Sequence, residues 1–105
     1  SGIGMKPGAS VGVDIAGEKF EAAATGNGPV DASINALRQI VKRQITINEY
    51  TIQGVSKGSD DCCKVHMQVE HEGRYYYGFA ASTDIVTASI EAYVDCINKI
   101  HDFRI

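Results

Sequence analysis

The chain has no excess of basic residues, no long apolar run and no proline- or serine-rich linker. Its 105 residues include 10 Lys and Arg against 13 Asp and Glu, which gives a net charge of −3. Proteins that bind nucleic acid or anionic membranes usually carry a basic patch, so neither partner is expected. A membrane-spanning helix needs about 20 apolar residues in a row, and none is present. One domain with a modest core is therefore predicted.

Cysteine is also scarce, and the count of three is odd. Cys62 and Cys63 are adjacent and could bridge each other only with strain, so a reduced, cytoplasmic setting is expected. The cluster of Cys62, Cys63, His66 and His71 matches no common zinc spacing, and Lys64 lies inside it. A Cys–His nucleophile would lack an orienting third residue. The sequence therefore predicts no metal, no cofactor and no catalytic residue in this chain.

What the chain does contain is an internal repeat with an offset of 56 residues and no gap. Nine of the 36 residues in the segment 2–37 are identical to the residue 56 positions later. Residues 32–37, for example, align with residues 88–93. A repeat of this length indicates one supersecondary unit used twice. The two copies differ most at residues 26–29 and 82–85, where each chain segment turns from a strand into a helix.

The first repeat is predicted to contain two strands and a helix. Residues 10–16 alternate apolar and polar side chains, residues 16–19 reverse the chain, and residues 20–25 form a second strand. Asn27 or Gly28 can cap the following helix, and Pro29 suits its first turn. The helix is predicted to run to about residue 43. Its buried face is expected to consist of Ile34, Leu37, Ile40 and Val41.

The second repeat is predicted to contain three strands, at about residues 46–56, 63–70 and 75–81, followed by a helix capped by Ser82 or Thr83. The buried face of that helix is expected to consist of Ile85, Ala88, Ala92, Tyr93, Cys96, Ile97 and Ile100.

The whole pattern predicts an α+β fold of two strand-strand-strand-helix units, about residues 1–44 and 45–105, with the helices on one face of the sheets. The first strand of unit one would precede Ser1 at the repeat offset, so the chain is expected to be a fragment of a longer protein. Aromatic residues on both sides of the strand at residues 75–79 would leave an exposed apolar patch on the other sheet face. We expect a homodimer or a neighbouring domain to cover it.

The two strand-to-helix turns offer opposite chemistry. Gly26-Asn27-Gly28-Pro29 presents backbone donors at a helix N-terminus and suits an anionic group such as a carboxylate. Ser82-Thr83-Asp84 presents hydroxyls and a carboxylate, which suit an ammonium group. Helix capping alone explains each turn about as well. Taken together, the two turns suit a small zwitterionic ligand.

The same turns carry a resemblance to a known family. The motifs Gly26-Asn27-Gly28-Pro29-Val30 and Ser82-Thr83-Asp84-Ile85-Val86, with Tyr50 and Gly58 between them, resemble the C-terminal regulatory domain of α-isopropylmalate synthase and its relative citramalate synthase. The resemblance covers nearly the whole chain. The family domain has two strand-strand-strand-helix units and forms a homodimer, and it binds the end product leucine or isoleucine near the dimer interface. That binding inhibits a catalytic barrel in the same polypeptide, an acyltransferase that condenses acetyl-CoA with a 2-oxo acid.

The resemblance implies a non-catalytic, amino-acid-sensing domain, with leucine placed ahead of isoleucine as the effector. The effector-binding residues carried over by motif are Asn27, Gly28, Pro29, Val30, Tyr50, Ile52, Ala80, Ala81, Ser82, Thr83, Asp84 and Ile85. Two alternatives remain open. One is a structural dimerisation module without effector binding, and the other is a metal or thiol enzyme that uses Cys62, Cys63 and His66. The family usually has small residues where this chain has Cys62 and Cys63.

Overall fold

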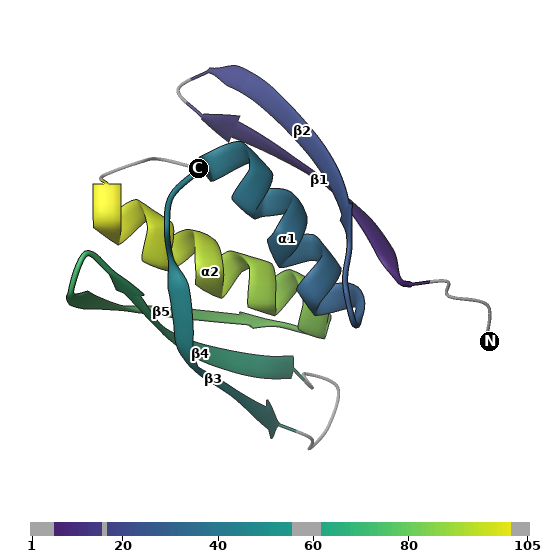
Figure 1. Ribbon diagram of the computed structural model, residues 1–105. Helices are drawn as coiled ribbons and strands as arrows, with labels where there is room; N and C mark the ends of the chain where they lie inside the picture. The colour runs from purple at the N-terminus through teal and green to yellow at the C-terminus, as the bar shows by residue number, and fades with distance from the viewer. Residues whose placement is uncertain (1–5, 16, 56–61, 102–105) are drawn as a thin grey trace. The chain divides into compact units, whose positions relative to one another are not determined.

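The computed structural model describes residues 6–15, 17–55 and 62–101. It forms two compact units, Ser1–Arg43 and Gln44–Ile105, called here the first and second unit. The first contains strands β1 (Gly8–Ile15) and β2 (Glu18–Thr25) and helix α1 (Pro29–Val41). The second contains strands β3 (Thr46–Val55), β4 (Cys62–His71) and β5 (Arg74–Ser82) and helix α2 (Ile85–His101). The predicted α+β class and the helix that follows each group of strands are confirmed (Figure 1).

The 56-residue repeat is also a structural repeat. Strand β2 begins at Glu18 and β5 at Arg74, and α1 begins at Pro29 and α2 at Ile85, which are offsets of 56 residues in both cases. The hairpin glycines Gly17 and Gly73 lie at the same offset, and both have positive φ angles. The two units are therefore copies of one strand-strand-helix pattern, and the second has the additional strand β3 in front of it.

In the first unit, β1 and β2 form an antiparallel hairpin that lies against α1. The register places Val11 opposite Ala22 and Val13 opposite Phe20. Val11, Val13 and Ala22 are half-buried, whereas the alternate residues of both strands are exposed. One face of the hairpin therefore packs under the helix. The buried residues of α1 are Ala32, Ser33, Ile34, Ala36 and Leu37.

In the second unit, the strands form an antiparallel sheet in the order β3-β4-β5. Helix α2 contacts β5 and β4 (Figure 1). The helix-side face contains Val65, Met67 and Val69, none more than 2% exposed. The other face carries a row of aromatic rings, Tyr75, Tyr77 and Phe79, which are 55%, 59% and 47% exposed. The predicted alternation of β4 and the exposed aromatic patch are both confirmed.

Helix α2 lies unusually close to β5 at Gly78. A Cβ atom on Gly78 would collide with the Ala92 carbonyl oxygen and lie 2.6 Å from Cys96 Sγ. Tyr93, Cys96 and Ile97 of α2 are essentially inaccessible to solvent. The absence of a side chain at Gly78 therefore sets the distance between helix and sheet in this unit.

Three details of the helices differ from the prediction. Helix α1 ends at Val41 rather than near residue 43, because Lys42 adopts a left-handed conformation (φ 55°) and its N–H bonds to the Arg38 carbonyl. Ile40 and Val41 are half-buried, as are Ile85 and Ile100 in α2, since each lies near a helix end. The cap of α2 is Asp84, not Ser82 or Thr83, because its carboxylate accepts the Thr87 N–H at 3.0 Å.

Candidate functional site

The start of α1 lacks a side-chain cap. Gly28 occupies the N-cap position in an extended conformation, and no side chain bonds the first-turn N–H groups there. The Gly28 carbonyl accepts the Ala32 N–H at 2.9 Å. Among the described residues, no hydrogen bond reaches the N–H groups of Val30 or Asp31. Pro29, the first helical residue, has no N–H to satisfy. These free donors and the helix dipole make the position suitable for an anion.

The turn before this helix start is held by hydrogen bonds to Pro7 and to the Asp31 side chain. Gly26 is buried and its N–H donates to the Pro7 carbonyl at 3.0 Å. A Cβ atom on Gly26 would lie 2.5 Å from the Ala32 nitrogen, so no larger residue fits without movement. The Asn27 N–H donates to Asp31 Oδ2 at 2.9 Å. Of the sequence-predicted residues here, Asn27 and Pro29 are exposed, whereas Gly28 and Val30 are half-buried.

The start of α2 is capped by its own carboxylate. Asp84 Oδ2 accepts the Thr87 N–H at 3.0 Å and the Thr87 hydroxyl at 2.5 Å. The Asp84 N–H donates to Ser82 Oγ at 3.1 Å. The Thr87 hydroxyl, followed by the Thr87 N–H, lowers the pKa of Asp84 below its ordinary value, so the carboxylate stays ionised at neutral pH. This rim therefore carries an exposed negative charge, which suits an ammonium group.

Two further predicted residues, Tyr50 and Ile52, lie on β3. Their register partners on β4 are Met67 and Val65, so both side chains belong to the helix-side face of the sheet. They are nevertheless 39% and 49% exposed, because α2 packs over β4 and β5 rather than over β3. The Tyr50 hydroxyl hydrogen-bonds to Ser89 Oγ on α2 at 2.5 Å. The result is an apolar surface with one anchored hydroxyl.

The remaining predicted residues are divided between the two faces of β5 and the turn after it. Ala80 is 9% exposed and belongs to the core, whereas Ala81 is exposed on the other face. Their side chains therefore cannot both contact one small ligand. Thr83 is exposed, and Ser82 and Ile85 are half-buried next to the Asp84 cap.

Ser89 is not among the site residues predicted from the sequence. It is fully buried, and its partner Tyr50 is 39 residues away in the sequence, so spacing alone could not connect them. The repeat could have drawn attention to it, because Ser33 occupies the equivalent position in α1 and is also buried. Ser33 instead donates to the Pro29 carbonyl of its own helix at 2.7 Å.

The cysteines form no recognisable site. Cys62 and Cys63 are free and half-buried, and no group of three His, Cys, Asp or Glu side chains is placed to hold a metal within the described residues. Cys96 is buried against β4 and β5, where burial raises the pKa of its thiol to about 11. In the part of the chain that the structure describes, no helix is long and apolar enough to cross a membrane.

Comparison with known proteins decides the family. Residues 1–101 match the model of the LeuA allosteric (dimerisation) domain, which is nearly the entire chain. The chain belongs to this family. The resemblance based on the two helix starts is thereby confirmed.

The relatives of this LeuA domain are long enzymes. This chain is 52% identical over 100 residues to a 2-isopropylmalate synthase of Parabacteroides distasonis. It is 44% identical over 100 residues to a 2-isopropylmalate synthase of Sediminispirochaeta smaragdinae. A third, from Trichodesmium erythraeum, is 42% identical over 85 residues. The alignments cover 94% of this chain in the first case and 81% in the third. They span only 20% and 16% of those relatives.

Proposed function

We propose that this LeuA domain is the feedback-regulatory domain of a cytoplasmic 2-isopropylmalate synthase, and that it forms a homodimer and binds leucine as effector. The observation that carries the proposal is the uncapped start of α1 in the first unit. Gly28 leaves the first-turn N–H groups of α1 without a side-chain cap, and such a helix start suits the carboxylate of an amino acid. In the second unit, taken by itself, the Asp84 carboxylate suits an ammonium group.

In the second unit, the exposed apolar surface on β3 suits a branched side chain. Tyr50 and Ile52 are accessible although they lie on the core side of the sheet. Burying a leucine side chain against such a surface contributes about 1.5–3 kcal/mol. Isoleucine has the same atoms in a different shape, so the contour of the apolar surface would decide between the two effectors.

The homodimer is supported by the family description as a dimerisation domain. The exposed row of Tyr75, Tyr77 and Phe79 supports contact with another copy or with the catalytic barrel of the same polypeptide. Inhibition would require leucine to favour one arrangement of the dimer, and couplings between such sites are typically about 1–3 kcal/mol. The fragment itself is expected to catalyse nothing.

A thermal-shift titration with leucine, isoleucine and valine tests the proposal. A ligand at about 100 times its Kd stabilises by about 2.7 kcal/mol, which raises the Tm by several degrees in a domain of this size. We expect leucine to give the largest shift. A Gly28→Asp variant should abolish the shift, because a carboxylate then fills the start of α1.

Ser10→Asp is the matched control, since it adds the same charge on an exposed strand residue of the first unit. It should leave the leucine shift unchanged. A larger shift with isoleucine would reassign the effector and point to a citramalate synthase. No shift with any of the three amino acids would leave a structural dimerisation module as the better description.

A further inference from the structure

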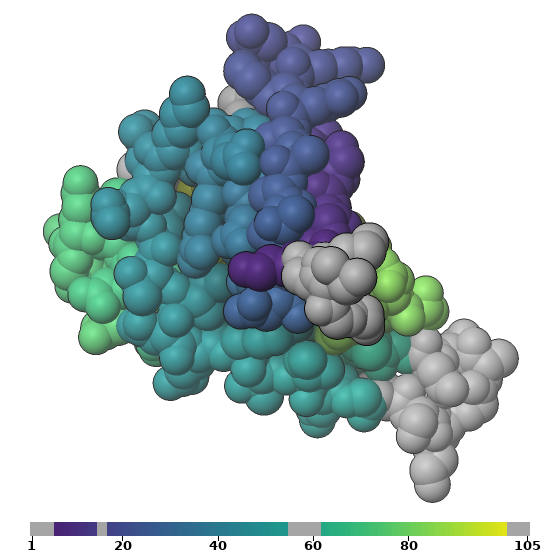
Figure 2. Space-filling view, turned by 45° about the vertical axis from the view of Figure 1, so that its right-hand side comes forward, coloured from purple at the N-terminus to yellow at the C-terminus, as the bar shows by residue number. Residues whose placement is uncertain are grey.

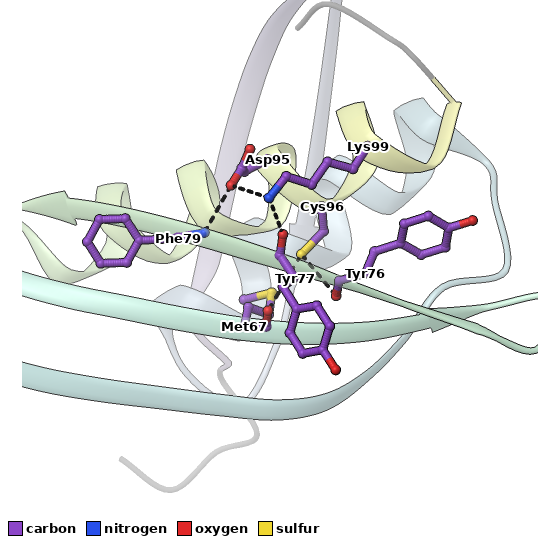
Figure 3. Close-up of polar contacts among 7 residues, drawn as sticks. All are labelled: Met67, Tyr76, Tyr77, Phe79, Asp95, Cys96 and Lys99. Carbon is purple, nitrogen blue, oxygen red and sulfur yellow. Dashed lines mark hydrogen bonds and ion pairs between the residues drawn. The ribbon is translucent and has the colours of Figure 1, made fainter.

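The outer edge of β5 is closed by side chains of α2. Asp95 Oδ2 accepts the Phe79 N–H at 3.0 Å, and Lys99 Nζ donates to the Tyr77 carbonyl at 2.6 Å. Asp95 and Lys99 also form an ion pair at 3.5 Å (Figure 3). These backbone groups point away from β4, so they are the ones that an added strand would need. Strand addition at this part of β5 is therefore blocked.

The first unit closes the equivalent edge in the same way. Gln39 of α1, 56 residues before Asp95, donates to the Ala23 carbonyl at 3.3 Å. Asn35 donates to the Thr25 carbonyl at 3.1 Å. The outer edges of β2 and β5 are thus both protected at these positions by side chains of the helix that follows each strand, although the residue types differ between the copies.

The outer edge of β3 has no such protection. The alternation of strand hydrogen bonds turns the backbone groups of Tyr77 and Phe79 outward on β5. Gln68 of β4 is paired with Tyr77 of β5 and with Glu49 of β3, so the backbone groups of Glu49 point toward β4. Because the direction alternates along a strand, the backbone N–H and C=O groups of Tyr50 and Ile52 point outward from β3. No hydrogen bond from any described residue reaches these groups. Strand β3 contains no proline, lysine or arginine, and its single charged residue is Glu49. Exposed edge strands usually carry proline or charged side chains, lysine above all, that prevent another strand from pairing with them.

The same strand also leaves apolar surface uncovered. Helix α2 packs over β4 and β5, and it reaches β3 through the Tyr50–Ser89 hydrogen bond. Ile47 is half-buried, and Tyr50 and Ile52 are 39% and 49% exposed on the helix side of the sheet. Part of β3 forms the teal surface at the bottom of Figure 2. An accessible edge and an accessible apolar flank on one strand both favour an added strand.

We infer that β3 pairs antiparallel with β3 of a second copy, about a twofold axis at Thr51, to make one six-stranded sheet. The inference rests on the homodimer proposed above and specifies its contact surface. In this register Tyr50 lies opposite the partner's Ile52, and the two apolar flanks cover each other. Glu49 lies opposite the partner's Gln53, so no like charges meet. The pairing begins beyond the β-bulge between Ile47 and Glu49, where the strand is regular.

Disulfide trapping tests the pairing at its centre. Thr51 would form a non-hydrogen-bonded pair with its own copy, with Cα atoms about 4.5 Å apart, and a disulfide can span that distance. The variant is Thr51→Cys in a Cys62→Ser/Cys63→Ser background, oxidised and analysed as a covalent dimer. Ala81→Cys in the same background is the matched control, because Ala81 is equally small and exposed on the closed strand β5. We expect Thr51→Cys to cross-link and Ala81→Cys to remain monomeric on a non-reducing gel.

A charge exchange provides a second readout that needs no oxidation. Thr51→Lys or Thr51→Glu alone places like charges opposite each other at the axis and should weaken the dimer up to about fivefold. A mixture of the two variants should restore the original affinity in a heterodimer, measured by light scattering and native mass spectrometry.

The outcomes separate the two proposals. A dimer that cross-links at residue 81 but not at residue 51 overturns the β3 pairing and leaves the homodimer intact. A dimer affinity that is unchanged by both Thr51→Lys and Thr51→Glu does the same. A chain that remains monomeric in light scattering overturns both. The leucine titration reports independently on effector binding.

Discussion

The two units place glycine and aspartate at the same position of the repeat, and the consequences are opposite. Gly28 leaves the start of α1 without a side-chain cap, whereas Asp84 satisfies the Thr87 N–H at the start of α2. Helix stability favours the aspartate. The glycine gives up that stabilisation and keeps free N–H donors. The comparison teaches that one copy of the unit leaves its first-turn N–H groups without a side-chain cap, while the other caps them with a carboxylate.

A second difference lies under the helices. Ala22 in β2 corresponds to Gly78 in β5, and only the glycine lies against a helix backbone that excludes a Cβ atom. Among the described residues, the second unit contributes the larger set of buried side chains. It is therefore expected to be the more rigid of the two.

The largest effect is expected from Gly78→Ala. The added Cβ would collide with the Ala92 carbonyl and Cys96 Sγ, which are held by the helix backbone and the core. Overpacking of this kind should lower the free energy of unfolding by about 3 kcal/mol, measured by urea denaturation. The matched variant Ala22→Gly should cost only about 0.5–1 kcal/mol. Equal effects of the two variants would show that the close packing is not specific to the second unit.

A smaller effect is expected from Ser89→Ala. It removes the hydrogen bond to Tyr50 and should cost about 1 kcal/mol. Tyr50→Phe should cost a similar amount, and the double variant should cost less than the sum, because both remove the same bond. Ser33→Ala is the control from the first unit and should cost less, since its hydroxyl bonds only within its own helix. Additive costs in the double variant would argue against the Tyr50–Ser89 bond.

A substitution at the N-cap of α1 tests the difference between the two helix starts directly. Gly28→Ser should stabilise the chain by a few tenths of a kcal/mol, because a serine caps better than a glycine and its Cβ meets nothing within 4 Å. The same variant should weaken leucine binding, because its hydroxyl competes for the free N–H groups. Thermal melts with and without leucine measure both effects. A variant that is stabilised but binds leucine as before would remove the start of α1 from the site.

The smallest effect at neutral pH is expected from Asp84→Asn, because asparagine also caps helices well. The Tm values of the variant and of the original chain should differ at low pH. A lowered pKa in the folded state contributes stability above the unfolded value of about 4, and this is lost as the pH falls through the folded value. The variant should therefore have a shallower decline in Tm as the pH falls below about 4. Thr87→Val should also flatten that decline, since it removes the main hydrogen bond to the carboxylate. An unchanged decline in both variants would contradict the assignment.

Much of the fold could be predicted because local patterns repeat. Alternation in β4, the helix faces and the offset of 56 residues all follow from short-range spacing, and two independent copies agree. The helix ends were less accurate. Lys42 ends α1 through its left-handed backbone, and Asp84 outcompetes Ser82 and Thr83 as a cap through contacts with Thr87. Several residues near each turn have cap-forming side chains, so the sequence permits more than one choice.

The candidate site, like the fold, could be predicted from the sequence only in part. The two helix starts were visible in the sequence because glycine, proline and acidic residues have distinct backbone chemistry. The Tyr50–Ser89 bond and the Asp95 and Lys99 contacts with β5 were not visible, since each connects residues at least 16 positions apart.

The sequence by itself determined the repeated unit, the class of fold, and glycine at one helix start with aspartate in the turn at the other. Periodicity and turn chemistry act over a few residues and can be recognised without a partner. Only the tertiary structure decided which strand edges are closed and which apolar residues stay accessible. Those properties depend on which helix lies beside which strand, because an edge is closed only when a side chain from another element reaches its backbone.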